Sequence, residues 1–106
     1  MKSVYVAGPI AGGDQYLNVR NAVHAAARLW EAGYVPYVPH LSFIWHMLVP
    51  TPYEDWMSMD FYWIKKCDFL VRLPGKSPGS DREVEFARQS GIPVFFGLDG
   101  FLESMK

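Results

Sequence analysis

Residues 3–14 read Ser-Val-Tyr-Val-Ala-Gly-Pro-Ile-Ala-Gly-Gly-Asp, and this stretch decides the fold class. Its first five residues are uncharged and mostly β-branched or aromatic, which predicts a buried strand over residues 3–7. The strand ends at Gly8-Pro9, and Asp14 then supplies the N-cap of a helix that Gly33 ends. The apolar positions of this helix are expected to form its buried face: Tyr16, Val19, Val23, Ala26 and Trp30. A buried strand followed by a glycine-rich loop and an amphipathic helix is typical of the first half of a parallel β-α-β unit.

The rest of the chain continues this alternation of strands and helices. The expected strands span residues 34–38, 68–73 and 92–96, and the expected helices span residues 51–66 and 80–89. Residues 40–50 are expected to be irregular, and residues 98–106 are expected to form only a short turn. Thr51 and Glu54 have the spacing of a capping box, with Pro52 at the first helical position. We therefore predict one α/β domain, residues 1–106, built on a parallel sheet.

The composition excludes several classes of protein. Half of the 106 residues are hydrophobic and 20% are charged, so the chain can bury a core and is not a disordered tail. Ten Lys and Arg residues balance eleven Asp and Glu residues, which argues against nucleic-acid binding through a basic surface. No stretch approaches the roughly 18 apolar residues of a membrane span, and the N-terminal apolar run is too short for a signal peptide.

The cysteine and histidine content argues against disulfide and metal chemistry. Cys67 is the only cysteine and cannot form an internal disulfide, so we expect a cytoplasmic protein in a reducing compartment. His40 and His46 have no cysteine or third histidine nearby, so no metal site is expected.

Two loops are expected to meet at one edge of the sheet. Right-handed crossovers place the loops after the first and third strands at the carboxyl edge, where open α/β sheets bind ligands. Segments 8–14 and 73–80 should therefore face each other. Ser77, Gly79 and the first free amides of the next helix form a junction of the kind that binds phosphate. The alternative is an ordinary surface loop capped by Ser80.

Glu83 has two interpretations. Ser80-x-x-Glu83 is a capping box, in which the glutamate has a structural role only. A carboxylate in the first helical turn at the ligand edge is also kept ionised by the helix N-terminus, so that it can attack an electrophilic carbon or stabilise a cation. On this second interpretation Glu83 is a nucleophile.

Asp60 is the more unusual carboxylate. On its helix it shares a face with Trp56, Trp63 and Ile64, so its carboxyl loses hydration, which raises its pKa. An acid that holds its proton near neutral pH suits a general acid, and this is the role we expect for Asp60. The alternative is a solvated aspartate at the margin of the buried face.

An ordered set of motifs resembles a known family. The residues are Tyr5-Val6-Ala7-Gly8-Pro9-Ile10 with Gly12-Gly13, Asp60 followed by Cys67-Asp68, and Ser77-x-Gly79-x-x-x-Glu83-x-x-x-Ala87 with Gly91-Ile92-Pro93-Val94. Over nearly the whole chain they resemble the nucleoside 2-deoxyribosyltransferase superfamily. The resemblance implies a flavodoxin-like three-layer sandwich with a parallel sheet of four, or five, strands.

The resemblance also implies a reaction and a site. The reaction is cleavage of the N-glycosidic bond of a (deoxy)nucleoside or its 5′-monophosphate through a glycosyl-enzyme intermediate on Glu83. Asp60 is then the second carboxylate, and Tyr5 lies near the sugar. The expected substrate-binding residues are Gly8, Pro9, Ile10, Gly12, Gly13, His40, Ser77 and Gly79. Neither cofactor nor metal is expected.

Ser77 selects a branch of the superfamily. Transferases of free nucleosides usually carry an aspartate at this position, whereas serine is similar to the branch of 5′-monophosphate N-glycosidases. A hydroxyl beside helix amides would hold a phosphate that an aspartate would repel. We therefore expect a nucleotide N-glycosidase. The alternatives are a deoxyribosyltransferase and a nucleotide-binding or sequestering module without turnover.

The aromatic segment suggests self-association. Trp45, Trp56 and Trp63 lie in a segment more aromatic than one small sheet is expected to cover. We expect a homodimer, or a higher homo-oligomer, that buries part of residues 41–63. Apart from this second copy, the expected partner is a small nucleotide or nucleoside, not a nucleic acid or a membrane.

Overall fold

The computed structural model describes all residues 1–106 and contains ten elements. In chain order they are β1 (Ser3–Ala7), α1 (Gln15–Glu31), β2 (Val35–Tyr37), the 3-10 helix η1 (Pro39–Ser42), α2 (Phe43–Leu48), α3 (Tyr53–Lys66), β3 (Phe69–Arg72), α4 (Pro78–Gln89), β4 (Val94–Phe96) and α5 (Leu98–Ser104). No helix combines the length and apolar character needed to cross a membrane.

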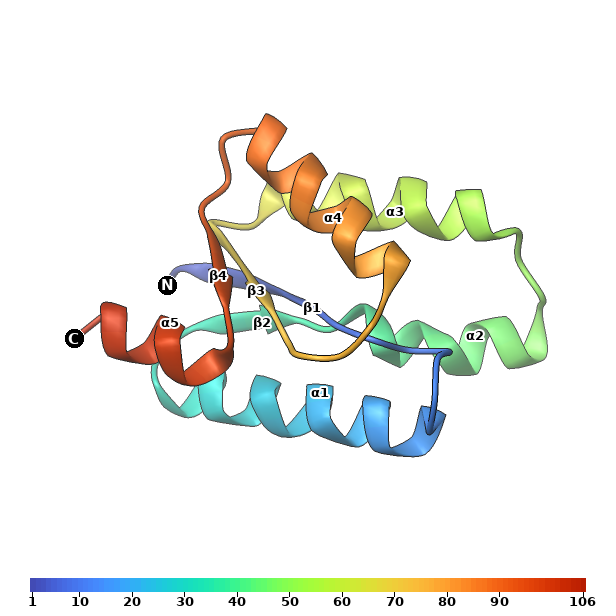
Figure 1. Ribbon diagram of the computed structural model, residues 1–106, viewed down its shortest axis with the longest axis horizontal. Coiled ribbons are helices and arrows are strands. Elements are labelled where there is room, and N and C mark those ends of the chain that lie inside the picture. The colour runs from blue at the N-terminus through green and yellow to red at the C-terminus, as the bar shows by residue number, and fades with distance from the viewer.

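The four strands form one parallel sheet in the order β2-β1-β3-β4. Figure 1 shows α1 and α5 on one face of the sheet and α3 and α4 on the other. This arrangement confirms the predicted α/β three-layer sandwich with four strands, and there is no fifth strand. Because β1 lies between two neighbours and between two helical layers, its residues are buried on every side.

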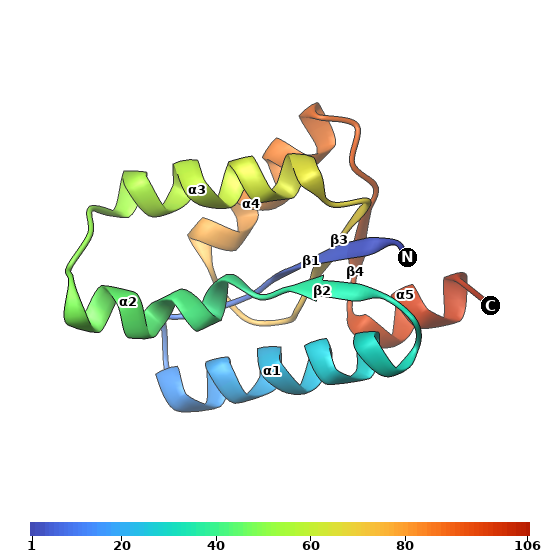
Figure 2. The ribbon, with the colours of Figure 1, turned by 180° about the vertical axis from the view of Figure 1, so that it is seen from behind.

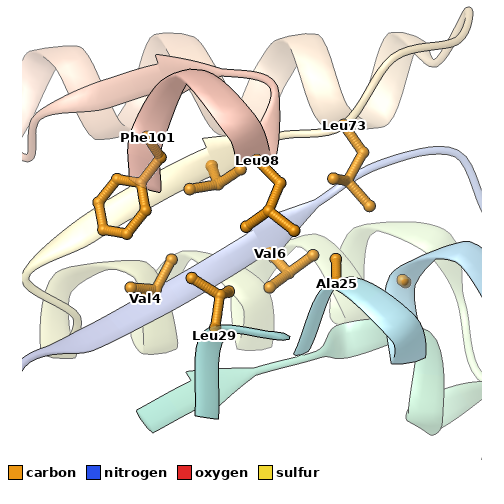
Figure 3. Close-up of a cluster of buried hydrophobic side chains, with 9 residues drawn as sticks. Val4, Val6, Ala25, Leu29, Leu73, Leu98 and Phe101 are labelled. Carbon is orange, nitrogen blue, oxygen red and sulfur yellow. The ribbon is translucent and has the colours of Figure 1, made fainter. Parts of the chain in front are cut away.

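Alternation along the strands divides the core into two parts. Val4 and Val6 of β1 face α1 and α5, where Leu29 and Phe101 complete an apolar cluster (Figure 3). Tyr5 and Ala7 point to the opposite face, into a second cluster with residues of α3 and α4. The face that carries Tyr5 is also the face on which the candidate site forms.

The predicted buried face of α1 is wrong. Ala22, Ala25 and Leu29 contact the sheet, whereas Tyr16 is 75% exposed and Trp30 is 58% exposed. The two faces lie roughly a quarter of a turn apart around the helix. Alanines at the contact let the helix approach the sheet closely, and the bulky side chains are turned outward. The predicted N-cap at Asp14 is confirmed, since its carboxylate accepts a hydrogen bond from the Leu17 amide.

Three local predictions around α2, α3 and α5 are also wrong. Residues 40–50, expected to be irregular, include η1 and α2, and Figure 2 shows the chain leaving β2 through α2 and turning back into α3. Thr51 does not cap α3, because its hydroxyl donates to the Val49 carbonyl instead. The C-terminal turn is a helix, α5, that buries Phe101 against the sheet.

The start of α4 differs from the prediction in a way that matters for the site. The helix begins at Pro78, and its N-cap is Ser77, whose Oγ accepts from the Ser80 amide at 3.1 Å. Ser80 is therefore inside the helix and caps nothing. Glu83 lies in the second turn and not in the first.

Candidate functional site

A cavity of about 600 Å³ opens at the carboxyl edge of β1 and β3. Its walls come from the loop after β1, from α2 and α3, and from the loop and first turns around the start of α4. The predicted site residues that line it are Gly8, Pro9, Ile10, Gly12, Asp60, Ser77, Gly79 and Glu83.

The two loops meet as predicted. A Cβ on Gly75 would lie 2.8 Å from Cγ of Pro9, and a Cβ on Gly8 would lie 3.2 Å from Cβ of Leu73. Gly75 also has a φ of 116°, which other residues rarely adopt. The loop after β1 and the loop after β3 therefore pack tightly against each other.

Tyr5 and Glu83 form the centre of the site. Tyr5 is fully buried in β1, and its hydroxyl donates to Oε2 of Glu83 at 2.6 Å. Glu83 is only 5% exposed. Burial raises the pKa of the Tyr5 hydroxyl well above its ordinary value, with the Glu83 and Asp60 charges adding to the effect, so Tyr5 remains a neutral donor. The capping-box interpretation of Glu83 is therefore wrong, since its side chain bonds to another element.

Asp60, half-buried on α3, lies near enough to Glu83 and Tyr5 for the three groups to shift one another's pKa. Burial raises the pKa of Asp60, and its hydrogen bonds with Glu83 and Tyr5 act against that rise. Burial also raises the pKa of Glu83 well above its ordinary value, and the hydrogen bond with Asp60 and the charge of Asp60 raise it further. The two carboxyls form one titrating pair, in which both negative charges are unfavourable at once.

The expected ionisation of Glu83 has to be corrected. Sequence reasoning keeps Glu83 ionised, whereas burial raises the pKa of Glu83 well above its ordinary value. The reason is positional: the influence of a helix N-terminus fades within the first turn, and α4 begins at Pro78. The pKa of Asp60 is raised by burial, which is the direction expected from its helical neighbours. The helix N-terminus therefore does not keep Glu83 ionised, and the two carboxyls share a proton as a pair.

Arg72 organises the end of the cavity next to α4 and was missed by sequence reasoning. Its guanidinium is buried at the end of β3 and donates to the Leu73 carbonyl, to the Gly75 carbonyl at 2.9 Å and to Oδ1 of Asp81 at 3.1 Å. A single side chain thus joins the strand end, the loop and the first turn of α4. The only sequence signal is an arginine at the end of an apolar strand.

The start of α4 presents hydrogen-bond donors to the cavity. Ser77 uses its hydroxyl within the chain, accepting from the Ser80 amide and donating to Oγ of Ser80 at 2.9 Å. The Ser80 hydroxyl proton and the first-turn amide of Gly79 are left for a ligand. Lys76, which sequence reasoning did not select, also lines the cavity and adds a positive charge.

Three predicted site residues do not line the cavity. Tyr5 lies beneath Glu83, and Gly13 belongs to an exposed turn with a φ of 71°. His40 is 1% exposed, and its Nε2 lies 3.1 Å from the Pro9 carbonyl oxygen, so it supports the loop from behind. Burial lowers the pKa of His40, which therefore stays neutral.

A largely aromatic wall of the cavity was also missed. Phe43 and His46 reach it from α2, and Tyr53 and Trp56 reach it from α3. The T-shaped contact of Trp45 with Trp56, with ring centroids 5.1 Å apart, joins the two helices. The sequence placed Trp56 on the same helical face as Asp60, four residues earlier, but did not assign it to the site. Nothing in residues 40–50 indicated which side chains would turn inward.

Two solved structures share this fold. The chain matches a "2-desoxiribosyltransferase from Leishmania mexicana" with a TM-score of 0.68 and 18% identity, over 91% of this chain and 63% of the other. It also matches a 2-deoxyribosyltransferase from the bacterium Bacillus psychrosaccharolyticus with a TM-score of 0.61 and 20% identity, over 89% of this chain and 70% of the other. The chain thus spans slightly less than two thirds of the length of the Leishmania protein.

The sequence comparisons identify the family. Among curated proteins no match was found. The family model described as "Domain of unknown function (DUF4406)" matches residues 2–96, and the chain therefore belongs to this family.

Proposed function

We propose that this protein cleaves the N-glycosidic bond of a nucleoside 5′-monophosphate, with Glu83 as the nucleophile. The observation that carries the proposal is the hydrogen bond from Tyr5 to Glu83, with the Asp60 carboxyl near enough to raise the pKa of Glu83, in a cavity at the carboxyl edge of the sheet. Retaining glycosidases need two carboxyl groups close together, because no water has to fit between them. The shared fold with two proteins named as deoxyribosyltransferases supports the same class of chemistry.

In the first step the sugar is transferred to the protein. The pair holds one proton, which Asp60 carries in the reacting state, and the Glu83 carboxylate accepts the hydrogen bond of Tyr5. An oxygen of Glu83 then forms a bond to C1′ while the bond from C1′ to the base nitrogen breaks and its electron pair stays on the base. Asp60 gives its proton to the base, which leaves in neutral form.

In the second step water releases the sugar. The Asp60 carboxylate takes a proton from water, whose oxygen bonds to C1′ as the ester bond to Glu83 breaks. Glu83 leaves as a carboxylate and Asp60 again holds the proton, so the pair returns to its starting protonation. The net reaction consumes one water and yields a free base and a sugar 5′-phosphate.

The start of α4 is proposed to hold the 5′-phosphate. The Gly79 amide, the Ser80 hydroxyl and the charge of Lys76 meet at this end of the cavity, as an anion requires. Ser77, the residue on which the branch assignment rests, acts here as the N-cap that orients Ser80. We therefore propose that the Ser80 hydroxyl contacts the phosphate, in place of the Ser77 hydroxyl expected from the sequence.

Two other functions fit part of the structure. A deoxyribosyltransferase would use the same carboxyl pair and pass the sugar to a second base in place of water, and the names of the two fold relatives favour this reading. A binding or sequestering module would use the cavity without turnover. Raised pKa values at two carboxyls inside a cavity are typical of catalysis and argue against this last function.

A panel of nucleosides and their 5′-monophosphates tests the proposal. Incubation with the protein and chromatographic analysis should show a free base from at least one monophosphate. The matching nucleoside should bind at least about tenfold more weakly, because charge-assisted contacts to a phosphate contribute more than about 1.4 kcal/mol. Equal affinity for both would refute the phosphate site.

Adding a second base to the panel separates hydrolysis from transfer. A new nucleotide in the presence of the acceptor base would identify a transferase. Tight binding of a monophosphate with no base released under any condition would identify a sequestering module. In either case the proposed hydrolysis would be wrong.

We also propose that the protein is a homodimer through α2. Residues 32–53 contain no Asp, Glu, Lys or Arg, and the exposed apolar side chains in this segment include Leu41, Ile44, Trp45, Met47, Leu48 and Val49. A two-fold contact places a surface against itself, so an uncharged apolar surface suits it. Trp45 belongs to this surface, whereas Trp56 is turned into the cavity wall.

Light scattering at high micromolar concentration tests the dimer. The wild type should have twice the mass of the chain, and Ile44→Glu should have the mass of a monomer because a buried charge without a partner is strongly unfavourable. Trp30→Glu, a change of an exposed aromatic residue on α1, is the matched control and should leave the mass unchanged. A monomeric wild type would contradict the proposal.

A further inference from the structure

The arrangement around His46 points to a group that recognises a ligand. Nδ1 of His46 accepts two hydrogen bonds, from the Thr51 amide at 3.1 Å and from Nε1 of Trp56 at 3.1 Å. A neutral imidazole that accepts at Nδ1 carries its proton on Nε2. Two contacts from different segments therefore hold the ring in one tautomer and one orientation, in the wall of the cavity.

We propose that Nε2–H of His46 recognises the nucleobase by donating a hydrogen bond to an acceptor atom on its edge. This inference rests on the proposed function, in which the cavity holds a nucleotide. On this inference the aromatic wall formed by α2 and α3 binds the base, and His46 selects which base is bound.

The position of His46 fits a base attached to a sugar at the carboxyl pair. Trp56 lies one helical turn before Asp60 on α3, about 6 Å along the axis, and His46 is bonded to Trp56. The base is joined directly to C1′, so its ring falls within this distance of the reacting atom. The donors for the phosphate come from the start of α4, on a different wall of the cavity.

Most other donors of this wall are already used, and the exception, the Tyr53 hydroxyl, lies beside the start of α4, 3.1 Å from where a Cβ on Gly79 would be. The Ser42 hydroxyl donates to the Pro39 carbonyl at 2.6 Å, and the Thr51 hydroxyl donates to the Val49 carbonyl at 2.9 Å. The Thr51 amide and the Trp56 indole both donate to His46 itself. Of the donors that α2 and the segment joining it to α3 place at the cavity, Nε2–H of His46 is the one left for a ligand.

The surroundings suit a flat aromatic ring with polar edges. Phe43 and Trp56 line the cavity with His46, and no charged residue occurs between positions 32 and 53. Aromatic and apolar side chains bind the faces of a base, and a single donor then reads its edge. The ligand must present an acceptor, such as a purine ring nitrogen or a pyrimidine carbonyl. A base without one would leave a polar group unpaired.

Two substitutions separate the two nitrogens of the ring. In His46→Asn the amide oxygen takes the place of Nδ1, so it preserves the bonds to Thr51 and Trp56 but removes the donor. In His46→Gln the amide nitrogen takes the place of Nε2, so it preserves the donor but removes the acceptor. His24→Asn, at an exposed position on α1 outside the cavity, is the matched control.

Two measurements on the purified full chain then decide the proposal. The first is the affinity for free purine and pyrimidine bases, measured by titration calorimetry. The second is kcat/KM for the monophosphate that the wild type cleaves. We expect His46→Asn to melt like the wild type and to lose about tenfold to a hundredfold in both quantities, as for one unpaired donor. His46→Gln should recover part of the loss, and His24→Asn should match the wild type.

A base analogue without the acceptor atom provides an independent check. The wild type should bind it as weakly as His46→Asn does, and the substitution should cause no further loss, because the same hydrogen bond is absent in both cases. The proposal is overturned if His46→Asn retains wild-type base affinity, or if His46→Gln is more impaired than His46→Asn, which would make His46 a structural anchor only.

The test of base recognition by His46 does not depend on whether the proposed hydrolysis is found. If no monophosphate is cleaved, the calorimetric comparison of free bases between the wild type and His46→Asn still tests the recognition by His46. If the wild type binds none of the bases, the inference is wrong as well.

Discussion

Glu83→Gln is expected to reduce base release by at least about a thousandfold, because the amide cannot form the bond to C1′ and the remaining groups supply only part of the catalysis. Glutamine has the shape of glutamate and can still accept the hydrogen bond of Tyr5. The measurement is the rate of free-base formation from the best monophosphate of the panel. A residual rate within tenfold of the wild type would exclude Glu83 as the nucleophile.

The same substitution should stabilise the fold. The pKa of Glu83 is raised in the folded protein, so the free energy of unfolding of the wild type falls as the pH rises through that raised pKa. Below the ordinary pKa of a glutamate, Glu83 is protonated in both the folded and the unfolded chain and does not lower the stability. The melting temperature of Glu83→Gln should therefore equal that of the wild type below about pH 4 and exceed it at neutral pH. Each kcal/mol gained raises the melting temperature of a domain of this size by about 4–8 °C. Glu85→Gln, at an exposed position on the same helix, is the control and should show no such difference.

Asp60→Asn is expected to lower the rate by about 10²–10⁴-fold, the usual contribution of a general acid, and to change the shape of the pH profile. In the wild type, activity should fall at high pH when the pair loses its shared proton, because the departing base then receives none. The asparagine variant has no such proton to lose, so its activity should not fall on the basic side. Its acidic limb should move to lower pH, since Asp60 raises the pKa of Glu83.

The test is kcat/KM against pH for the wild type and the variant with one substrate. Asp55→Asn, an exposed change in the first turn of the same helix, serves as the control and should keep the wild-type profile. If Asp60→Asn kept a fall in activity at high pH with the same midpoint, another group would be the proton donor.

The sheet could be predicted from the sequence because its signals are local. Each strand is a short apolar run bounded by glycine, proline or charged residues, and the alternation with helices specifies a parallel sheet. The buried face of α1 could not be predicted, since it depends on how closely Ala22 and Ala25 approach the sheet. A small side chain carries little hydrophobic signal, whereas exposed Trp30 carries a strong one.

The sequence indicated which carboxyl residues lie at the candidate site better than it indicated their protonation. Asp60 and Glu83 were selected from their helical neighbours and from the expected carboxyl edge, and the structure brings them together with Tyr5. The raised pKa of Glu83 was not foreseen, because it depends on the helix start at Pro78 and on burial by distant segments. His46 was missed as a candidate ligand contact for a similar reason: its orientation is set by Trp56, ten residues away on another helix.

The central position of β1 has a consequence for how the chain folds. The bond from Tyr5 to Glu83 closes a sequence separation of 78 residues, and at about 5–20 residues per second a ribosome takes roughly 4 to 16 seconds to synthesise that length. Until β3 has been synthesised β1 can pair at most with β2, so one edge of this largely apolar strand stays open to other nascent chains. Such a long-range closure is slow in folding, and the candidate site is therefore among the last parts of the molecule to form.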